Sequence, residues 1–383
     1  MLRFVTAGES HGPCLTVIIE GLPAGLNLDI DQINEELARR QQGYGRGGRM
    51  KIESDKADIV SGVRFGQTLG SPITIIIKNC DWENWQQRMS VEGAKTGEAV
   101  TNARPGHADL TGVLKYDRQD IRDILERASA RETAARTAVG AIMKQFLRTA
   151  ANIEIASHVI NIGGIKFDKP VTFFEIKNNR SHETGCVDLQ TETAMKALID
   201  TAKQNGDTLG GVFEIVATNL IVGLGSHIQW DRRLDTKLTA ALMSIPAVKG
   251  VEIGDGFEYA NLYGSQAHDE IFYEAQKGYY HKTNHAGGIE GGMSNGEDIR
   301  ARAVMKPIPT LMKPLQSVNI LTKDSVTANT ERSDACAVPA AAVVGEAMMA
   351  ITLAEALIQK FSSDNMTDLL NSIESYNLRL SRC

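Results

Sequence analysis

The chain has 383 residues, a formal net charge of −6 and ordinary contents of hydrophobic (42%) and charged (23%) residues. These values are typical of a soluble globular protein, whereas proteins that wrap nucleic acid carry a basic excess. No stretch approaches the roughly 18 unbroken apolar residues of a membrane helix, and the first residues lack the apolar segment of a signal peptide. We therefore expect a cytoplasmic protein that binds neither a membrane nor nucleic acid.

The first part of the chain alternates strand and helix patterns. Strand patterns occupy Leu15–Glu20, Asp58–Phe65 and Ile73–Lys78. Between the first two, Asp29 offers a helix N-cap and Gln32 follows three residues later. Apolar residues at helical spacing then predict a helix that runs to about Gln41 and stops at Gly43.

A long irregular stretch precedes a long helix pattern. The segment Cys80–Gly112 is polar and irregular, and a loop of this length in a compact protein is usually functional or disordered. Apolar periodicity then predicts one helix over about Arg118–Leu147. Its middle, ASARETAARTAVGA, is rich in small residues, so we expect another element to pack closely against it.

The second half repeats this mixture of elements without repeating the sequence. Helix patterns occur near Glu192–Gln204, Arg232–Ser244 and Ala335–Lys360. Val212–Val222 is predicted as one long strand, and the glycine-rich segment Gly287–Gly296 as a loop. Because no Pro- or Ser-rich linker divides the chain, we predict an α+β fold with one large domain over residues 1–383 and two pseudo-similar halves.

Cysteine usage agrees with an intracellular protein. The five cysteines are Cys14, Cys80, Cys186, Cys336 and Cys383. They are far apart and form no C-x-x-C pair, which argues against a disulfide framework and against a thiolate zinc site. We expect buried free thiols.

An arginine- and glycine-rich segment stands out in this acidic chain. Between Arg39 and Lys51 the sequence reads RRQQGYGRGGRMK, with no acidic residue. It matches G-x-G-x-x-G, but it follows a helix instead of a strand, which argues against a dinucleotide fold. Glycines allow an anion to approach the backbone, and Arg40, Arg46 and Arg49 supply forked donors for phosphate or carboxylate. A solvated basic loop and an RNA contact are the alternatives.

A second arginine pair lies on the predicted long helix. Arg127 and Arg131 are four residues apart, so they are predicted to share a face, with Ser129 between them. Such a face suits a planar or anionic ligand. The alternative is a pair of structural salt bridges to Glu126 or Glu132.

Two histidines lie in glycine-bearing loops. His11 occurs in GESHG and His107 in RPGHAD. Histidine titrates near neutral pH, so either residue suits a general acid that gives a proton to a departing phosphate. A hydrogen-bonded structural histidine is the alternative at each position.

Acidic and basic residues in the C-terminal half add to these candidates. Asp334 precedes an apolar helix pattern, where it is either an N-cap or a base, and Arg332 is a candidate anion contact. In the segment Lys306–Thr310 two prolines stiffen a loop that carries a lysine and a threonine. His281 and His285 have metal-ligand spacing, but no third ligand is evident, so no metal site is predicted.

Eight stretches along essentially the whole chain resemble the chorismate synthase family. They are GESHGP, RRQQGYGRGGRM, ARPGHADLTG, ERASARETAARTAVGA, KGVEIGDGF, GGIEGGMSNGE, MKPIPTL and ERSDACAVPA, in this order. The resemblance implies a homotetramer of β-α-β sandwich subunits that binds reduced FMN. It also implies a lyase that eliminates phosphate from 5-enolpyruvylshikimate 3-phosphate to give chorismate, in the last step of the shikimate pathway.

The resemblance also implies roles for individual residues. Its flavin contacts fall on Arg127, Ala128, Ser129, Pro246, Ala247, Gly291, Lys306, Pro307, Ile308, Pro309, Thr310 and Arg332. Its NADPH contacts fall on Arg40 and Arg46. Its substrate contacts fall on Arg40, Arg46, Arg49, Arg104 and Arg131. Its catalytic positions are His11, His107 and Asp334. In this scheme His11 protonates the departing phosphate, His107 controls flavin protonation, and Asp334 relays a proton near the flavin.

Two other functions compete with this lyase. A flavin- or NADPH-dependent oxidoreductase predicts one NADPH consumed per product, because hydride transfer is then net. An RNA-binding protein that uses the arginine- and glycine-rich loop predicts strongly salt-dependent RNA affinity. The source of the reduced flavin is a separate question. Since no extra reductase domain is evident, we expect an external reductase to supply reduced flavin.

Overall fold

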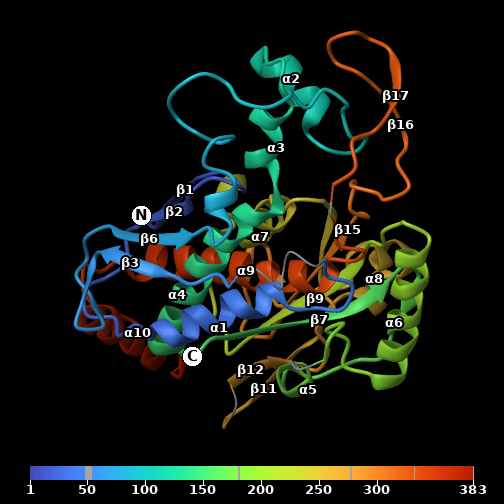
Figure 1. Cartoon of the computed structure of the whole chain (residues 1–383). Coiled ribbons are helices and arrows are strands. Elements are labelled where there is room, and N and C mark those ends of the chain that lie inside the picture. Colours follow the sequence, from blue (N-terminus) through green and yellow to red (C-terminus); the bar gives the residue numbers. More distant parts are fainter. Residues whose placement is uncertain (48–53, 180–181, 277, 332, 383) are drawn as a thin grey trace.

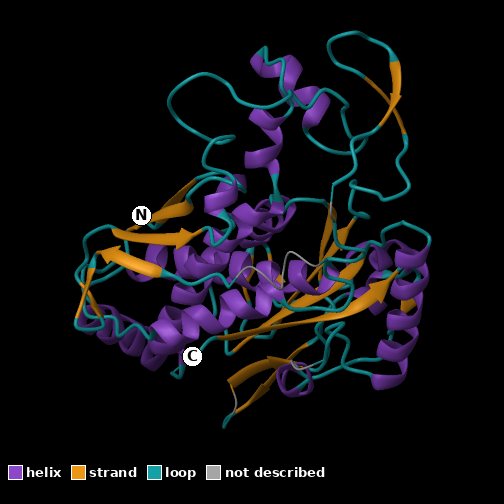
Figure 2. Cartoon of the chain, viewed as in Figure 1, coloured by secondary structure: helices purple, strands orange, loops and turns teal. Residues whose placement is uncertain are grey.

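Two antiparallel sheets enclose a central layer of helices in this computed structural model, which describes residues 1–47, 54–179, 182–276, 278–331 and 333–382 (Figures 1 and 2). The first sheet has the order β1 (Arg3–Ala7), β2 (Cys14–Glu20), β6 (Ile73–Lys78) and β3 (Asp58–Ser61). The second has the order β10 (Val248–Ile253), β15 (Ile299–Met305), β9 (Gly211–Thr218), β7 (Glu154–Ile162) and β8 (Ile165–Lys166). The main central helices are α1 (Ile30–Gln41), α4 (Thr133–Ala151) and α9 (Val338–Phe361). The predicted α+β sandwich is therefore confirmed, while its assignment to one domain stays a prediction.

Shorter elements surround this sandwich. The remaining helices are α2 (Asp109–Tyr116), α3 (Arg122–Ala128), α5 (Phe173–Asn178), α6 (Leu189–Gln204), α7 (Leu234–Met243), α8 (Gly264–Ala267) and α10 (Met366–Leu380). Two-stranded pairs are formed by β4 (Val63–Arg64) with β5 (Gln67–Thr68), β11 (Ile271–Glu274) with β12 (Gly278–His281), β13 (Ile289–Glu290) with β14 (Met293–Ser294), and β16 (Gln316–Val318) with β17 (Ser325–Thr327). The 3-10 turns within the described residues are η2 (Trp82–Asn84), η3 (Ala130–Glu132), η4 (Trp230–Arg232) and η5 (Gly256–Asn261).

The core lies between each sheet and the central helices. Along β6, Ile73, Ile75 and Ile77 are buried and alternate with more exposed residues, as expected for a strand with one face on the core. Helices α4 and α9 pack closely at Gly140. A Cβ atom at this position would lie only 2.2 Å from the Cβ of Ala347, so a larger residue would not fit. The close packing predicted from the small residues of α4 is therefore confirmed.

Helix α9 is apolar and long enough, by length and composition, to span a membrane, although Glu346 and Glu355 interrupt it, so it contains no run of about 18 unbroken apolar residues. In the fold, 94% of its most apolar window is buried inside the protein. The apolar run is therefore explained by the central position of this helix, which is hydrophobic nearly all round.

A buried ion network joins three helices in this central layer. Glu346 of α9 is fully buried and pairs with Arg39 of α1 at 2.9 Å and with Lys144 of α4. Glu36 pairs with the same two cations, at 2.7 Å and 2.6 Å. Each buried charge therefore has an opposite partner, as burial of charge requires.

The boundaries of several predicted elements are confirmed. Helix α1 ends at Gln41 and its N-cap Asp29 accepts from the backbone of Asp31 and Gln32. Strand β6 has the predicted bounds, and β2 begins one residue earlier than predicted. Helices α6, α7 and α9 lie where the second-half patterns predicted them.

Three predicted elements are wrong in length or continuity. The helix predicted over Arg118–Leu147 is divided into α3, η3 and α4, because Ser129 adopts an extended backbone (ψ 140°) and its hydroxyl caps η3. The strand predicted over Asp58–Phe65 is interrupted at Gly62, where φ is +80°. Strand β9 ends at Thr218, before the predicted Val222, and the following Asn219 has φ +61°. The glycine-rich loop 287–296 contains the short β13–β14 hairpin.

The described cysteines are all free, but only two are buried. Cys186 and Cys336 are buried, while Cys80 is exposed and Cys14 is partly exposed. Burial raises the pKa of Cys336 to about 11, so its thiol stays protonated at neutral pH. The prediction of buried thiols is therefore wrong for Cys80, and Cys383 lies outside the described residues.

Two long excursions project from the sandwich and pack against each other (Figure 1). One runs from the end of β6 through α2 to α3, and the other carries β16 and β17. The amide of Ile320 donates to the carbonyl of Thr101, and Ile320 packs on a small cluster of Ala103, Val113, Ile121 and Leu125. This contact fixes the His107 loop beside the segment that leads to α9.

Candidate active site

A pocket of about 400 Å³ lies where the α3–η3 junction, the loop after α1 and the segment before α9 meet. The predicted site residues that line it are His11, Arg40, Arg46, Arg104, His107, Ala128, Ser129, Arg131, Pro246, Ala247, Lys306, Ile308, Pro309, Thr310 and Asp334. These residues come from both halves of the chain, so the fold brings together most of the motifs that the sequence singled out.

The other predicted residues lie elsewhere or are not described. Arg127 is exposed and donates to the carbonyl oxygens of Thr6 and Gly8. Gly291 is exposed at the turn of the β13–β14 hairpin, and Pro307 is exposed between two lining residues. The predicted residues Arg49 and Arg332 lie outside the described residues.

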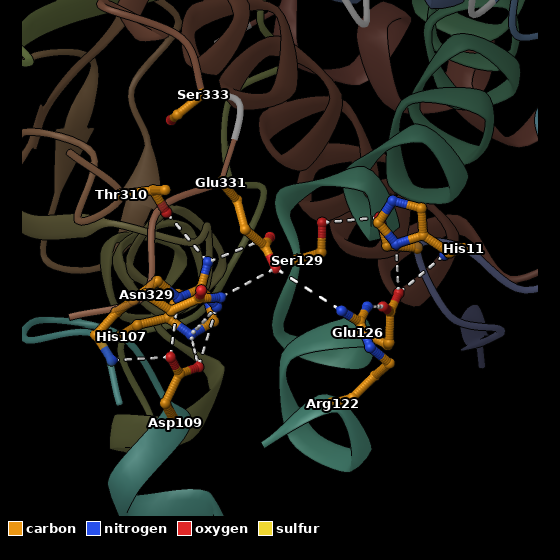
Figure 3. Close-up of polar contacts among 12 residues, drawn as sticks. His11, His107, Asp109, Arg122, Glu126, Ser129, Thr310, Asn329, Glu331 and Ser333 are labelled. Atoms are coloured by element: carbon orange, nitrogen blue, oxygen red, sulfur yellow. Dashed lines mark hydrogen bonds and ion pairs between the residues drawn. The ribbon is translucent and has the colours of Figure 1, made fainter. Parts of the chain in front are cut away.

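His11 rests on a buried carboxylate at one side of the pocket (Figure 3). Its Nδ1 lies 2.8 Å from Oε2 of Glu126, and its backbone N–H donates to the same oxygen at 2.9 Å. Burial raises the pKa of Glu126, but the hydrogen bonds and charges of His11 and Arg122 outweigh it and hold that pKa below its ordinary value. The ring of Trp85 covers a face of the imidazole, with centroids 3.8 Å apart.

His107 rests on a second buried carboxylate at the opposite side (Figure 3). Its Nδ1 makes a short hydrogen bond with Oδ1 of Asp109, a residue with no exposed surface. Arg104 grips the same carboxylate through Nε (2.8 Å) and a terminal nitrogen (3.0 Å), and donates to Thr310. Burial raises the pKa of Asp109, but the bonds from His107 and Arg104 hold it well below its ordinary value.

Asp334 organises the loop that follows α1. Its Oδ2 lies 2.8 Å from the guanidinium of Arg46, and its Oδ1 accepts the backbone N–H of Gly47 at 2.6 Å. Helix α9 begins only at Val338 and has no side-chain N-cap, so the prediction that Asp334 caps it is wrong. The carboxylate instead holds the arginine- and glycine-rich loop against the pocket.

Arg40 and Arg131 share one carboxylate. The two oxygens of Asp55 lie 2.7 Å from Arg40 and 3.0 Å from Arg131, and all three side chains are at most 5% exposed. Nε of Arg40 is buried and has no hydrogen-bond partner among the described residues. Burial lowers the pKa of Arg40, and Arg46 and Arg131 reinforce this effect against Asp55. An anion in the pocket would relieve this concentration of positive charge.

The predicted face shared by Arg127 and Arg131 does not exist, because the extended backbone at Ser129 separates the two residues. Arg131 lines the pocket and Arg127 contacts the loop after β1. Neither pairs with Glu126 or Glu132 in the way that the structural alternative expected; Glu132 pairs with Arg136.

The loop around Lys306 closes the pocket beside His107. Nζ of Lys306 donates to the carbonyl of Gly106, and the backbone N–H of Lys306 donates to Ala247. Ala247 has φ +69°, a left-handed conformation that is uncommon for alanine and is typical of strained turns at functional sites. The apolar part of the pocket lining consists of Leu125, Ile245, Met305, Ala337, Ala340, Ala341 and Val344.

His281 and His285 do not form a metal site with each other. His281 lies 3.6 Å from both Glu290 and Glu297, and His285 pairs with Asp255 at 2.6 Å. Among the described residues, no group of three or more His, Cys, Asp or Glu side chains has the geometry to hold a metal ion.

Sequence reasoning missed the carboxylates that hold the site together. The sequence predicts Glu126 only as a partner of an arginine, and it predicts no role for Asp55 or Asp109. Asp109 follows His107 by two residues, so local spacing could have indicated it. Glu126 and His11 are 115 residues apart, and only the fold brings them together.

Comparisons with known proteins show similarity along nearly the whole chain. A family model described as chorismate synthase matches residues 2–358. A chorismate synthase of Geobacter sulfurreducens is 55% identical over 387 residues, and one of a Sulfurihydrogenibium species is 56% identical over 384; each alignment covers 98% of both chains. A crystal structure of a chorismate synthase has a TM-score of 0.81 and 44% identity, and covers 100% of this chain and 99% of its own.

These similarities extend over nearly the full length of the chain and its relatives. The chain therefore belongs to the chorismate synthase family, the carbon–oxygen lyases that eliminate phosphate from 5-enolpyruvylshikimate 3-phosphate to form chorismate in the last step of the shikimate pathway.

Proposed function

We propose that this pocket binds reduced FMN and the phosphorylated substrate together. The residues fit both groups, because small apolar residues that include Ala337, Ala340 and Ala341 line the same pocket as a set of arginines and a lysine. A flat aromatic ring suits the small apolar residues, and phosphate and carboxylate suit the guanidiniums. When bound, reduced FMN supplies electron density for an elimination with no net redox change.

The arginines are proposed to hold the substrate's anionic groups. Arg40 and Arg131 are fixed by Asp55, and Arg46 by Asp334, so their guanidiniums are held in place before an anion arrives. Arg104 is held by Asp109 and presents one edge toward Thr310. Arg49 stays a predicted substrate contact, and Arg40 and Arg46 stay predicted NADPH contacts.

The acid that protonates the departing phosphate is proposed to be His11. Its Nδ1 is engaged by Glu126, and no hydrogen bond joins Nε2 to another described residue, so Nε2 is available for a ligand. His107 and Asp334 are proposed to control protons at the flavin. Both residues line the same pocket as His11. The predicted flavin contacts on the pocket wall, and those at Arg127, Gly291, Pro307 and Arg332, belong to this proposal.

The oligomeric state of the enzyme and its source of reduced FMN are also proposed from the family resemblance. We propose a homotetramer in the cytoplasm that receives reduced FMN from an external reductase. Both sheets and the central helices share one continuous hydrophobic core, so the described residues form no separate unit to which flavin reduction is assigned.

The observation that carries the proposal is the arrangement of two carboxylate-bound histidines and four arginines around one pocket. The test is anaerobic: protein, chemically reduced FMN and substrate are mixed, and phosphate and chorismate are followed together. We expect equal release of both products over many turnovers without net flavin oxidation. Folded, FMN-binding protein that releases no phosphate, or that consumes one reductant per product, would contradict it.

A further inference from the structure

The proposed roles give the side chain of Glu126 no task of its own, yet its carboxylate is hydrogen-bonded to both the ring and the backbone of His11. One carboxylate oxygen, Oε2, accepts from both Nδ1 and the backbone N–H of His11. The other, Oε1, lies 2.6 Å from the guanidinium of Arg122, one turn earlier on α3. In addition, the carbonyl of Glu126 accepts the N–H of Ser10 at 3.0 Å.

These contacts fix the orientation of the imidazole ring. Residues 10 and 11 are tied to the end of α3 by two backbone donors and one ring nitrogen, and Trp85 packs on the ring. The carboxylate of Glu126 is only 2% exposed, and it stays ionised because its pKa is held below the ordinary value. An ionised carboxylate accepts and cannot donate, so a neutral His11 must carry its proton on Nδ1.

We infer that Glu126 is a positioning residue that fixes His11 with its Nδ1–H on the carboxylate and its Nε2 toward the departing phosphate. The inference rests on the proposed role of His11. In the elimination the carbon–oxygen bond breaks, its electron pair goes to the phosphate oxygen, and Nε2–H of the imidazolium supplies the proton. The ring is then neutral in the tautomer that Glu126 already holds, and the proton is restored from water. The ring hydrogen of the substrate leaves as a proton, so charge and atoms balance.

A double-mutant cycle separates this role from a merely structural one. Glu126→Gln should lower the anaerobic kcat about 10- to 100-fold, which is typical of the loss of a group that orients a functional histidine. The KM for substrate should change little, because Glu126 does not line the pocket. In a His11→Ala background the same substitution should change kcat by less than about twofold, because both act through one group.

The chain provides a matched control outside the pocket. Glu214 of β9 is also a mostly buried carboxylate that contacts a histidine, His158 at 3.2 Å, and an arginine, Arg300 at 3.0 Å. It does not line the pocket. Glu214→Gln should therefore leave kcat unchanged although it removes the same kind of buried charge.

The outcomes distinguish the inference from the function on which it rests. If His11→Ala turns over normally, the acid role of His11 fails. If His11→Ala is impaired but Glu126→Gln is normal, or if the two effects add fully, the acid role stands and the positioning role is overturned.

A second measurement uses the unaltered protein, in case Glu126→Gln does not fold. Nitrogen-15 spectra of histidine-labelled protein, with the His11 signals assigned by their loss in His11→Ala, report the neutral tautomer. We expect the proton on Nδ1 of His11. A proton on Nε2 would overturn the inference, because Glu126 then could not accept from Nδ1.

Discussion

The two histidines of the pocket have the same kind of support but different electrostatic surroundings (Figure 3). At His11, Arg122 contacts Oε1 of Glu126, whereas the other oxygen, Oε2, contacts His11. At His107 the guanidinium of Arg104 binds both oxygens of Asp109 and also lies 3.1 Å from Nδ1 of the ring. Among the described residues, Nδ1 of His107 therefore contacts both a carboxylate and a guanidinium, whereas Nδ1 of His11 contacts a carboxylate.

This difference in contacts is the reason to propose different tasks for the two histidines. The carboxylate of Glu126 holds Nδ1 of His11 and leaves Nε2 for the departing phosphate. The guanidinium of Arg104 joins His107 to the Asp109 carboxylate and to Thr310 on the Lys306 loop. Three changes test the comparison, from the largest expected effect to the smallest.

The largest effect is expected at Asp109. It receives bonds from the side chain and the backbone of Arg104 and from His107, while Arg104 itself is only 6% exposed. Asp109→Asn would remove the close charge partner of a buried guanidinium and leave it only the more distant Glu331, at 3.8 Å, which costs about 3–5 kcal/mol of unfolding free energy. Urea unfolding at neutral pH measures this loss. A loss under about 1 kcal/mol would show that Arg104 finds another partner.

The same pair predicts a pH dependence of stability. Because the folded pKa of Asp109 lies below its unfolded value of about 4, the stabilisation is complete above that pH and is lost as pH falls below it. The difference in unfolding free energy between the natural chain and Asp109→Asn should therefore narrow as the pH falls below about 4. A constant difference across that range would contradict the ionic origin of the effect.

An intermediate effect is expected at Asp55. Its two oxygens hold Arg40 and Arg131 in fixed positions, so Asp55→Asn should loosen the anion site and raise the substrate KM about tenfold. Steady-state kinetics with chemically reduced FMN measure this change in the substrate KM. A lower KM would mean that Asp55 acts chiefly by neutralising the arginines.

The smallest effect is expected at Trp85, which packs on His11 but not on His107. Trp85→Leu should lower kcat by about three- to fivefold, because aromatic packing of this kind is worth only about 1 kcal/mol. Trp230 is 75% exposed and lies on the separate turn η4, so Trp230→Leu serves as the control and should have no effect. Equal effects of both substitutions would contradict a specific contact.

Local signals in the sequence predicted individual strands, helices and site loops, whereas the sandwich and many of the pocket residues followed from the family resemblance. Alternating isoleucines define β6, Asp29 and Gln41 bound α1, and glycine-flanked motifs mark the loops around the pocket. The division of the long helix at Ser129 was missed because no proline or glycine stands there; a serine hydroxyl and the surrounding packing stabilise the extended residue.

Partner identity could not be predicted because it depends on long-range contacts. Arg39 and Arg40 are neighbours on α1, yet Arg39 belongs to the core network with Glu346 and Arg40 lines the pocket beside Asp55. Successive helical residues point about 100° apart, and the sequence pattern alone does not say which arginine faces the ligand. The carboxylate partner decides the role of each.

The central claim is that His11, and not His107, protonates the departing group. Its most direct test compares the natural substrate with an analogue in which sulfate replaces phosphate, because sulfate leaves without needing a proton. His11→Ala should lose about 10²- to 10⁴-fold in kcat on the phosphate and far less on the sulfate, whereas His107→Ala should lose equally on both. Equal losses of His11→Ala on the two substrates would contradict the claim.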